Sequence, residues 1–254
     1  MSKTLKQIRA GRLVYAVVYT TPTASDSVRA RAQKQKASTL AREKLNARTS
    51  FQKLERVLAA NFDNGDLMVT LTYDDAFLPE DKDRAVQKVK AFIKKLRAAR
   101  KARGQPLSYI YVTEGACPGG RLHHHMVINS TGEDFEEIRK LWRYGDNVEL
   151  TRLTFDQTYT YEDLASYLTK EPREWGHPMV GERTWTPSLG LAHPEPETET
   201  VPDYVTLTAP PEAITIAKEG PVKNGYGEYT WIKYLMPKAP RRKRAKRKKR
   251  HRKE

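Results

Sequence analysis

The chain of 254 residues has a single cysteine, Cys117, which excludes an internal disulfide and any zinc ribbon built from paired cysteines. No apolar run approaches the roughly 20 residues that a membrane-spanning helix needs, and no convincing signal-peptide cleavage site follows the basic start. A phosphate-binding loop of the form GxxxxGKS/T is also missing, which excludes a fused helicase. These absences predict a cytoplasmic protein with no membrane partner and disfavour an ATP-driven function.

Acidic residues are scarce at both ends of the chain. Residues 1–60 carry 13 lysines and arginines against three acids, and residues 238–254 carry 12 against one. Residues 61–237 have a net charge of −6, so a protein that coats nucleic acid with its whole surface is excluded. Two basic ends flank a weakly acidic core, and such ends attract a polyanion.

The basic tail, residues 238–254, is too polar to form a core and is predicted to be disordered when free. Its cations suit phosphate contacts that release counterions. A solubilising tail and a nuclear import signal are the alternative interpretations. The predicted nucleic-acid contacts in the tail are Arg241, Arg242, Lys243, Arg244, Lys246, Arg247, Lys248, Lys249 and Arg250.

The order of periodic segments predicts an α+β fold. Apolar and β-branched runs predict strands at residues 67–73, 107–113, 122–128 and 148–155. Helical spacing predicts helices that begin near residue 81 and span residues 133–142 and 161–170. This β-α-β-β-α-β order with one further helix predicts a ferredoxin-like (RRM-like) antiparallel sheet with helices packed on one face.

Composition divides the chain into four parts. Residues 28–60 lack glycine and proline, which predicts a basic, largely helical N-terminal region over residues 1–60. The predicted sheet belongs to a main domain, residues 61–200. A small β-rich extension follows at residues 201–237, with strands expected at 204–208, 213–217 and 228–234, before the tail at 238–254.

Three consecutive histidines stand in an otherwise apolar predicted strand. Because side chains alternate along a strand, His123 and His125 share one face and His124 points to the other. Two imidazoles spaced in this way can reach one cation, and Glu114 at the end of the preceding strand can add a carboxylate. Such a mixed set with open positions suits Mg²⁺ or Mn²⁺ as a Lewis acid on a phosphate.

Two other interpretations of the histidines compete with this site. Cys117, His123 and His125 could together bind Zn²⁺, although Cys117 lies in a loop with proline and glycine and is the sole thiol. A histidine cluster can also serve packing or form a pH-sensitive patch without any ion.

A tyrosine and a lysine lie three residues apart in the last predicted helix. Tyr167 and Lys170 are neighbours on one helix face, and the core-facing residues are Tyr161, Leu164, Ala165 and Leu168. A phenol is a weak nucleophile at neutral pH because its ordinary pKa is near 10. A nearby ammonium and a metal-polarised phosphate would favour attack by the phenolate. Taken alone, an ordinary surface tyrosine and lysine is the simpler interpretation.

Three segments together resemble, in order and spacing, the three motifs of the HUH endonuclease superfamily. They are Val69–Tyr73 (VTLTY), Glu114 with His123–His125, and Tyr167–Lys170 (YLTK). Within the superfamily the chain resembles rolling-circle replication initiators (Rep) of prokaryotic phages and plasmids, over about residues 67–170. One departure is His124, which stands where the family has a bulky hydrophobic residue; strand alternation still selects His123 and His125.

The resemblance implies sequence-specific nicking and joining of single-stranded DNA at an origin. Tyr167 would attack the scissile phosphorus, form a 5′-phosphotyrosine link and free a 3′-OH primer. The ion would be held by Glu114, His123 and His125, and Lys170 would stabilise developing charge or assist the metal site. Thr70 and Thr72 would lie beneath the site and help to bind DNA.

The resemblance also implies partners and a setting. Single-stranded DNA or an origin hairpin would be the substrate, with a separate helicase and polymerase from a bacterial host that carries the phage or plasmid. One well-placed tyrosine indicates a one-tyrosine mechanism, although Tyr159 and Tyr161 leave a paired mechanism open. The alternative functions are a transposase or relaxase of the same superfamily, and a non-catalytic nucleic-acid-binding protein.

Overall fold

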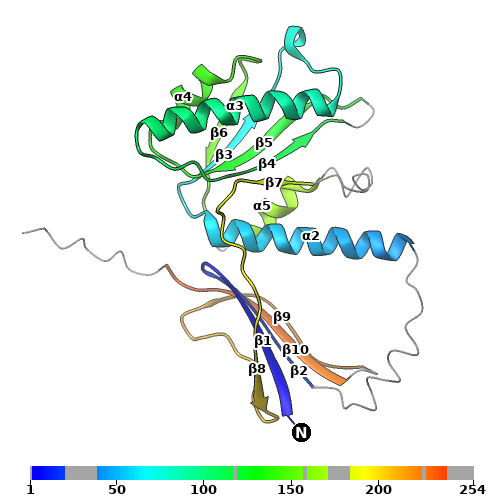
Figure 1. Cartoon of the computed structure of the whole chain (residues 1–254). Coiled ribbons are helices and arrows are strands. Elements are labelled where there is room, and N and C mark those ends of the chain that lie inside the picture. The colour runs from blue at the N-terminus through cyan, green and yellow to red at the C-terminus, as the bar shows by residue number, and fades with distance from the viewer. Residues whose placement is uncertain are drawn as a thin grey trace, which may run out of the picture.

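The computed structural model describes residues 2–20, 39–116, 119–156, 159–170, 184–224 and 227–238. Two five-stranded sheets lie one above the other, with helix α2 between them (Figure 1). We refer to them as the upper sheet (strands β3 to β7) and the lower sheet (β1, β2 and β8 to β10). Within these ranges, every helix is too short or too polar to cross a membrane.

The upper sheet has the predicted ferredoxin-like topology. Its strand order is β6-β3-β5-β4-β7, and each pair of neighbours is antiparallel. Helix α3 (Lys82–Ala102) connects β3 to β4, and α4 (Asp134–Leu141) connects β5 to β6. The strands are β3 (Leu67–Leu71), β4 (Tyr109–Glu114), β5 (His123–Ile128), β6 (Val148–Arg152) and β7 (Thr186–Pro187). The α+β prediction is therefore confirmed.

Helices α3 and α4 cover one face of the upper sheet, as predicted. Asp81 begins α3 by accepting a hydrogen bond from the Arg84 backbone N–H at 2.7 Å. The apolar side of α3 then packs on alternate residues of β3 and β5 in one buried cluster. Members of this cluster include Val89, Phe92, Leu96, Val69, Leu71, Met126, Ile138 and Trp142.

The opposite face of the upper sheet is covered by α5 (Tyr161–Leu168) and α2 (Thr39–Asn61). A capping box between Thr160 and Asp163 begins α5. The predicted core-facing residues of α5 are all buried, and they join residues of α2, β4 and β5 in a second cluster. The sheet therefore carries the predicted helix pair on one face and a further helical layer on the other.

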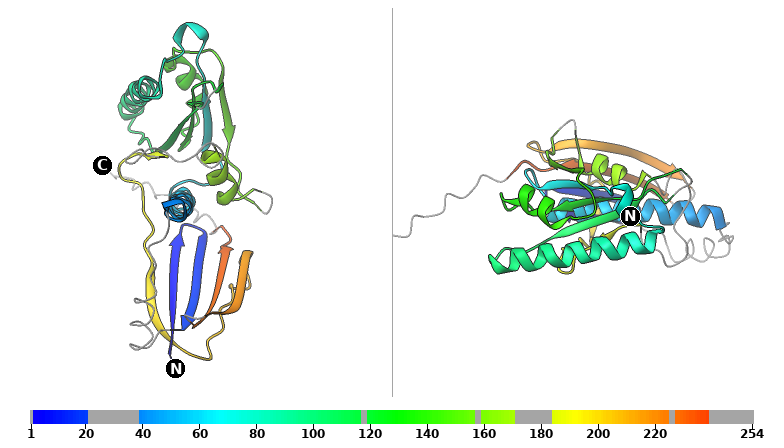
Figure 2. Two further views of the ribbon diagram at one scale, coloured as in Figure 1. Left: turned by 90° about the vertical axis from the view of Figure 1, so that its right-hand side faces the viewer. Right: turned by 90° about the horizontal axis from the view of Figure 1, so that it is seen from above.

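The lower sheet joins segments that lie before and after the upper sheet in the chain. Its order is β8-β1-β2-β10-β9 (Figure 2), with every described pairing antiparallel. Its strands are β1 (Ser2–Ala10), β2 (Leu13–Thr20), β8 (Glu197–Pro202), β9 (Ile214–Asn224) and β10 (Gly227–Leu235). Residues 2–20 thus form a hairpin within the region that was expected to be largely helical. The strand expected at 204–208 does not form, whereas β9 and β10 lie near the other two expected strands.

The β1–β2 turn packs directly on the backbone of α2. Gly11 has φ +57°, and a Cβ atom there would lie 2.2 Å from the carbonyl oxygen of Ala59, so only glycine fits this turn. Ala10, Leu13 and Leu235 from the lower sheet join the cluster that contains α2 and α5. One continuous core therefore connects the lower sheet to the upper sheet.

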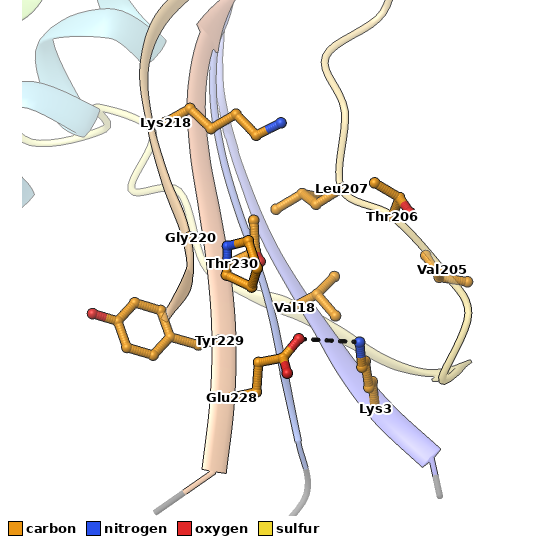
Figure 3. Close-up of a pocket in the computed structure, with 11 residues that line it drawn as sticks. Lys3, Val18, Val205, Thr206, Leu207, Lys218, Gly220, Glu228, Tyr229 and Thr230 are labelled. Carbon is orange, nitrogen blue, oxygen red and sulfur yellow. Dashed lines mark ion pairs between the residues drawn. The ribbon is translucent and has the colours of Figure 1, made fainter. Parts of the chain in front are cut away.

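The other face of the lower sheet borders a small pocket of about 160 Å³ (Figure 3). Residues 205–207 lie along one side of it, and Val18 and Thr230 lie on the sheet side. Lys3 and Glu228 at its edge pair with each other, with their nitrogen and oxygen 3.8 Å apart. The pocket is therefore bordered by charges that already neutralise one another.

A buried ion pair fixes the start of α4 to the end of α3. Arg100 is fully buried and its guanidinium donates to Asp134 Oδ1 at 2.6 Å and to the Asn129 carbonyl oxygen at 2.9 Å. Asp134 also accepts a hydrogen bond from the Thr131 backbone N–H at 2.8 Å. Removing the guanidinium would leave a buried carboxylate without its cation.

We predict that Arg100→Met lowers the free energy of unfolding by about 3–5 kcal/mol, because breaking a buried pair leaves one charge uncompensated. Urea denaturation of the full chain measures this loss. Lys95→Met, an exposed change on the same helix, is the matched control and should alter stability by less than about 0.5 kcal/mol. Equal effects of the two variants would contradict the prediction.

Candidate functional site

The pairing of β4 with β5 gathers the predicted metal ligands at one end of the upper sheet. Glu114 lies directly opposite His123, and Val112 lies opposite His125. Because alternate residues share a face, Glu114, His123 and His125 all point to the side on which α5 packs. Their ligand atoms lie within 4.8 Å of one another.

The geometry of this group fits a divalent ion. Glu114 Oε2 lies 3.6 Å from His123 Nε2 and 3.5 Å from His125 Nε2, and the two nitrogens are 3.1 Å apart. Two ligands at right angles on an octahedral ion with bonds of about 2.1 Å are roughly 3 Å apart. Glu114 is 2% exposed, and within the described residues neither of its carboxylate oxygens has a hydrogen-bond partner. A buried carboxylate of this kind is stabilised by a bound cation.

Neighbouring groups orient both imidazoles. His123 Nδ1 lies 2.8 Å from the carbonyl oxygen of Arg121, which can only accept, so Nδ1 donates and Nε2 faces Glu114 with its lone pair. His125 Nδ1 lies 3.2 Å from Thr70 Oγ1. Contacts of this type fix the ring orientation of metal ligands.

The structure gives the two predicted DNA-binding threonines contacts within the protein. Thr70 supports His125, as β3 places it opposite that residue. Thr72 donates a hydrogen bond from Oγ1 to the carbonyl oxygen of Asn147 at 2.7 Å. Their role in DNA binding stays a prediction. The pairing of Thr70 with His125 could not be found from the sequence because it requires the strand register.

Electrostatics keep the site carboxylate ionised. Burial alone would raise the pKa of Glu114, but the nearby His123 and His125 nitrogens and the Lys170 ammonium lower it to about 2. Lys170 Nζ lies 3.4 Å from Glu114 Oε2. The contact with Glu114 in turn raises the pKa of His123 above its ordinary value.

His124 points away from the site and is part of the core beneath α3. It is fully buried, with Nε2 at 2.6 Å from the Tyr73 hydroxyl and Nδ1 at 2.9 Å from Thr113 Oγ1. Burial lowers the pKa of His124 to about 3, so the ring is neutral at physiological pH. Strand alternation therefore separated the three histidines correctly: His124 packs, while His123 and His125 face Glu114.

Helix α5 brings Tyr167 and Lys170 to the same group. The Tyr167 hydroxyl lies 3.3 Å from His125 Nε2, and Tyr167 is 42% exposed. Lys170 Nζ lies 4.4 Å from the centre of the Tyr167 ring. Tyr161, by contrast, is buried and donates its hydroxyl to the carbonyl oxygen of Phe62 at 3.0 Å.

Two sets of predicted residues lie outside the described part of the chain. They are Cys117, from the alternative zinc set, and the tail cations from Arg241 to Arg250. The alternative zinc set and the tail contacts therefore remain predictions. Within the described residues, the sequence-predicted ligands and both α5 residues form one group.

The comparison with known families agrees with this segment of the chain. A family of replication-associated proteins, described under the name ORF2, matches residues 66–172. This stretch runs from β3 to just beyond α5 and contains the whole group described above. Neither the curated proteins nor the solved structures yield a match. The similarity supports a replication initiator protein.

We predict that Glu114→Gln weakens Mn²⁺ binding at least about a hundredfold, because loss of a ligand exceeds the 10–100-fold cost of losing a supporting contact. Affinity should also fall with pH below about 7, since the imidazoles must be deprotonated to bind and the pKa of His123 is raised. Isothermal titration calorimetry measures both effects. Glu149→Gln, an exposed change on β6, is the control; unchanged binding by Glu114→Gln would contradict the assignment of this ligand.

We predict that His124→Leu reduces the acid sensitivity of folding. The folded-state pKa of His124 is about 3 and the unfolded value is about 6.5. Stability is therefore complete above pH 6.5 and is lost as pH falls toward 3, by up to about 1.4 kcal/mol per pH unit. Urea denaturation between pH 7 and 4 should show a shallower slope for His124→Leu. The exposed His193→Leu should retain the original slope, and an identical slope for both variants would refute the argument.

Proposed function

We propose that the protein is an origin-specific endonuclease that starts rolling-circle replication by cutting one DNA strand with Tyr167. The observation that carries the proposal is the approach of an exposed phenol hydroxyl to a buried Glu-His-His group, at 3.3 Å from His125 Nε2. The match of this same segment to replication-associated proteins supports a replication role over a transposase or relaxase.

The proposed reaction is a transesterification. The Tyr167 oxygen forms a bond to the scissile phosphorus, and the bond from phosphorus to the 3′-oxygen breaks. The 3′-oxygen takes up a proton and becomes the primer hydroxyl, while the phenol proton is lost to solvent. The phosphate remains on Tyr167 as a 5′-phosphotyrosine, and attack by a 3′-OH reverses the reaction to join strands.

The residues around Tyr167 have separate tasks in this proposal. Glu114, His123 and His125 hold Mg²⁺ or Mn²⁺, which supplies positive charge beside the phosphate oxygens. Lys170, 4.4 Å from the phenol ring, stabilises negative charge on the attacking oxygen. The buried face of α5 holds Tyr167 in place beside His125.

The remaining parts of the proposal concern the partners. Single-stranded DNA or an origin hairpin is the substrate, and the tail cations add salt-sensitive phosphate contacts. Because the chain lacks a phosphate-binding loop, a separate helicase and polymerase of a bacterial host unwind and copy the DNA in the cytoplasm.

We predict that Tyr167→Phe abolishes covalent capture of DNA. The full chain is incubated with Mn²⁺ and single-stranded DNA from the encoding replicon, and denaturing gels show the protein–DNA adduct. The adduct should disappear with Tyr167→Phe and with EDTA, whereas Tyr159→Phe should retain it because that side chain is partly buried. An adduct that survives Tyr167→Phe would identify another nucleophile. Absence of cleavage by the unmodified chain on every origin-derived strand would favour a binding-only protein.

A further inference from the structure

A buried lysine from the lower sheet contacts acids on two different helices. Lys233 on β10 is 6% exposed, and its Nζ lies 3.2 Å from Glu55 Oε1 of α2. The same ammonium donates a short hydrogen bond to Glu162 in the first turn of α5. Tyr15 of β2 donates its hydroxyl to the other oxygen of Glu55. One cation thus links the lower sheet to α2 and to the helix that carries Tyr167.

The contact with Glu162 is not needed to begin α5. Thr160 and Asp163 already form the complete capping box, with the Asp163 carboxylate accepting the Thr160 backbone N–H at 2.6 Å. Glu162 is half-exposed, with 48% of its side chain accessible, whereas the Lys233 side chain is 7% accessible. The pair therefore holds the helix from outside, across the boundary between the two sheets.

Apolar contacts alone do not fix the rotation of a short helix. The buried face of α5 is held by side-chain packing, which is non-directional, whereas an ion pair with a hydrogen bond has a preferred geometry. Side chains lie about 6 Å from a helix axis, so a rotation of about 20° would move them by roughly 2 Å. A misplacement of about 1 Å can slow a reaction about a hundredfold.

We propose that Lys233 is a positioning residue for Tyr167, acting through Glu162 to fix the rotation of α5. This inference rests on the proposed function in naming Tyr167 as the nucleophile. Residues 2–20 and 214–235 then belong to the catalytic unit, because the lower sheet holds Lys233 in place.

The informative variant is at Glu162 and not at Lys233. Removing Lys233 would leave Glu55, which is 2% exposed, without its cation and would destabilise the whole core. Glu162→Ala cuts the link to α5 and leaves the Lys233–Glu55 pair intact. Glu136→Ala is the matched control, because Glu136 is an exposed acid in the first turn of α4 and the change has the same effect on helix propensity and helix dipole.

The first measurement is the rate of adduct formation at saturating DNA and Mn²⁺. We expect Glu162→Ala to slow it about ten- to a hundredfold with unchanged Mn²⁺ affinity, and Glu136→Ala to leave both unchanged. The second measurement does not need catalysis: fluorine NMR of the full chain labelled with 3-fluorotyrosine, with the Tyr167 signal assigned by Tyr167→Phe. We expect this signal to shift or broaden in Glu162→Ala only.

The outcomes separate the two proposals. A moved Tyr167 signal in a chain that forms no adduct would sustain the positioning role and refute the proposed function. An unchanged rate and an unchanged signal in Glu162→Ala would overturn the positioning role. A slower rate accompanied by an equal loss of Mn²⁺ affinity would also overturn it, because the whole site and not the helix rotation would then have changed.

Discussion

The arrangement of the site depends on the burial of one carboxylate. Glu114 is ionised in a place where water does not reach it, so positively polarised groups must surround it. They come from β5, as His123 and His125, and from the end of α5, as Lys170. Because α5 must reach this carboxylate, the upper sheet carries a helix on the face opposite α3 and α4. The second helical layer and its contact with α2 follow from that requirement.

Neighbouring residues on β5 serve two different environments. His124 and His125 are adjacent, yet one is neutral in the core beneath α3 and the other faces the carboxylate beneath α5. The hydrogen bonds of His124 to Tyr73 and Thr113 hold the strand in register from one side. A single strand therefore supplies both the packing that fixes its position and the side chains that face a ligand.

Local periodicity was enough to predict the upper sheet and the site, and was not enough for the lower sheet. Strand alternation separated His124 from His123 and His125, and the helical phase separated buried Tyr161 from exposed Tyr167. Both signals act over a few residues. In the lower sheet, β2 pairs with β10, where Tyr19 lies opposite Tyr229, and no local pattern names a partner so far along the chain. The contact from Lys233 to Glu162 was hidden for the same reason.

The lower sheet is built from two separate parts of the chain, and the upper sheet is inserted between β2 and β8. During synthesis the hairpin of β1 and β2 is made before the upper sheet, but its neighbour β10 is completed only at Leu235. The lower sheet therefore closes late and over long sequence separations, which folds slowly. A growing chain lacks this closure, so the order of synthesis itself delays assembly of the two joined sheets until β10 has been made.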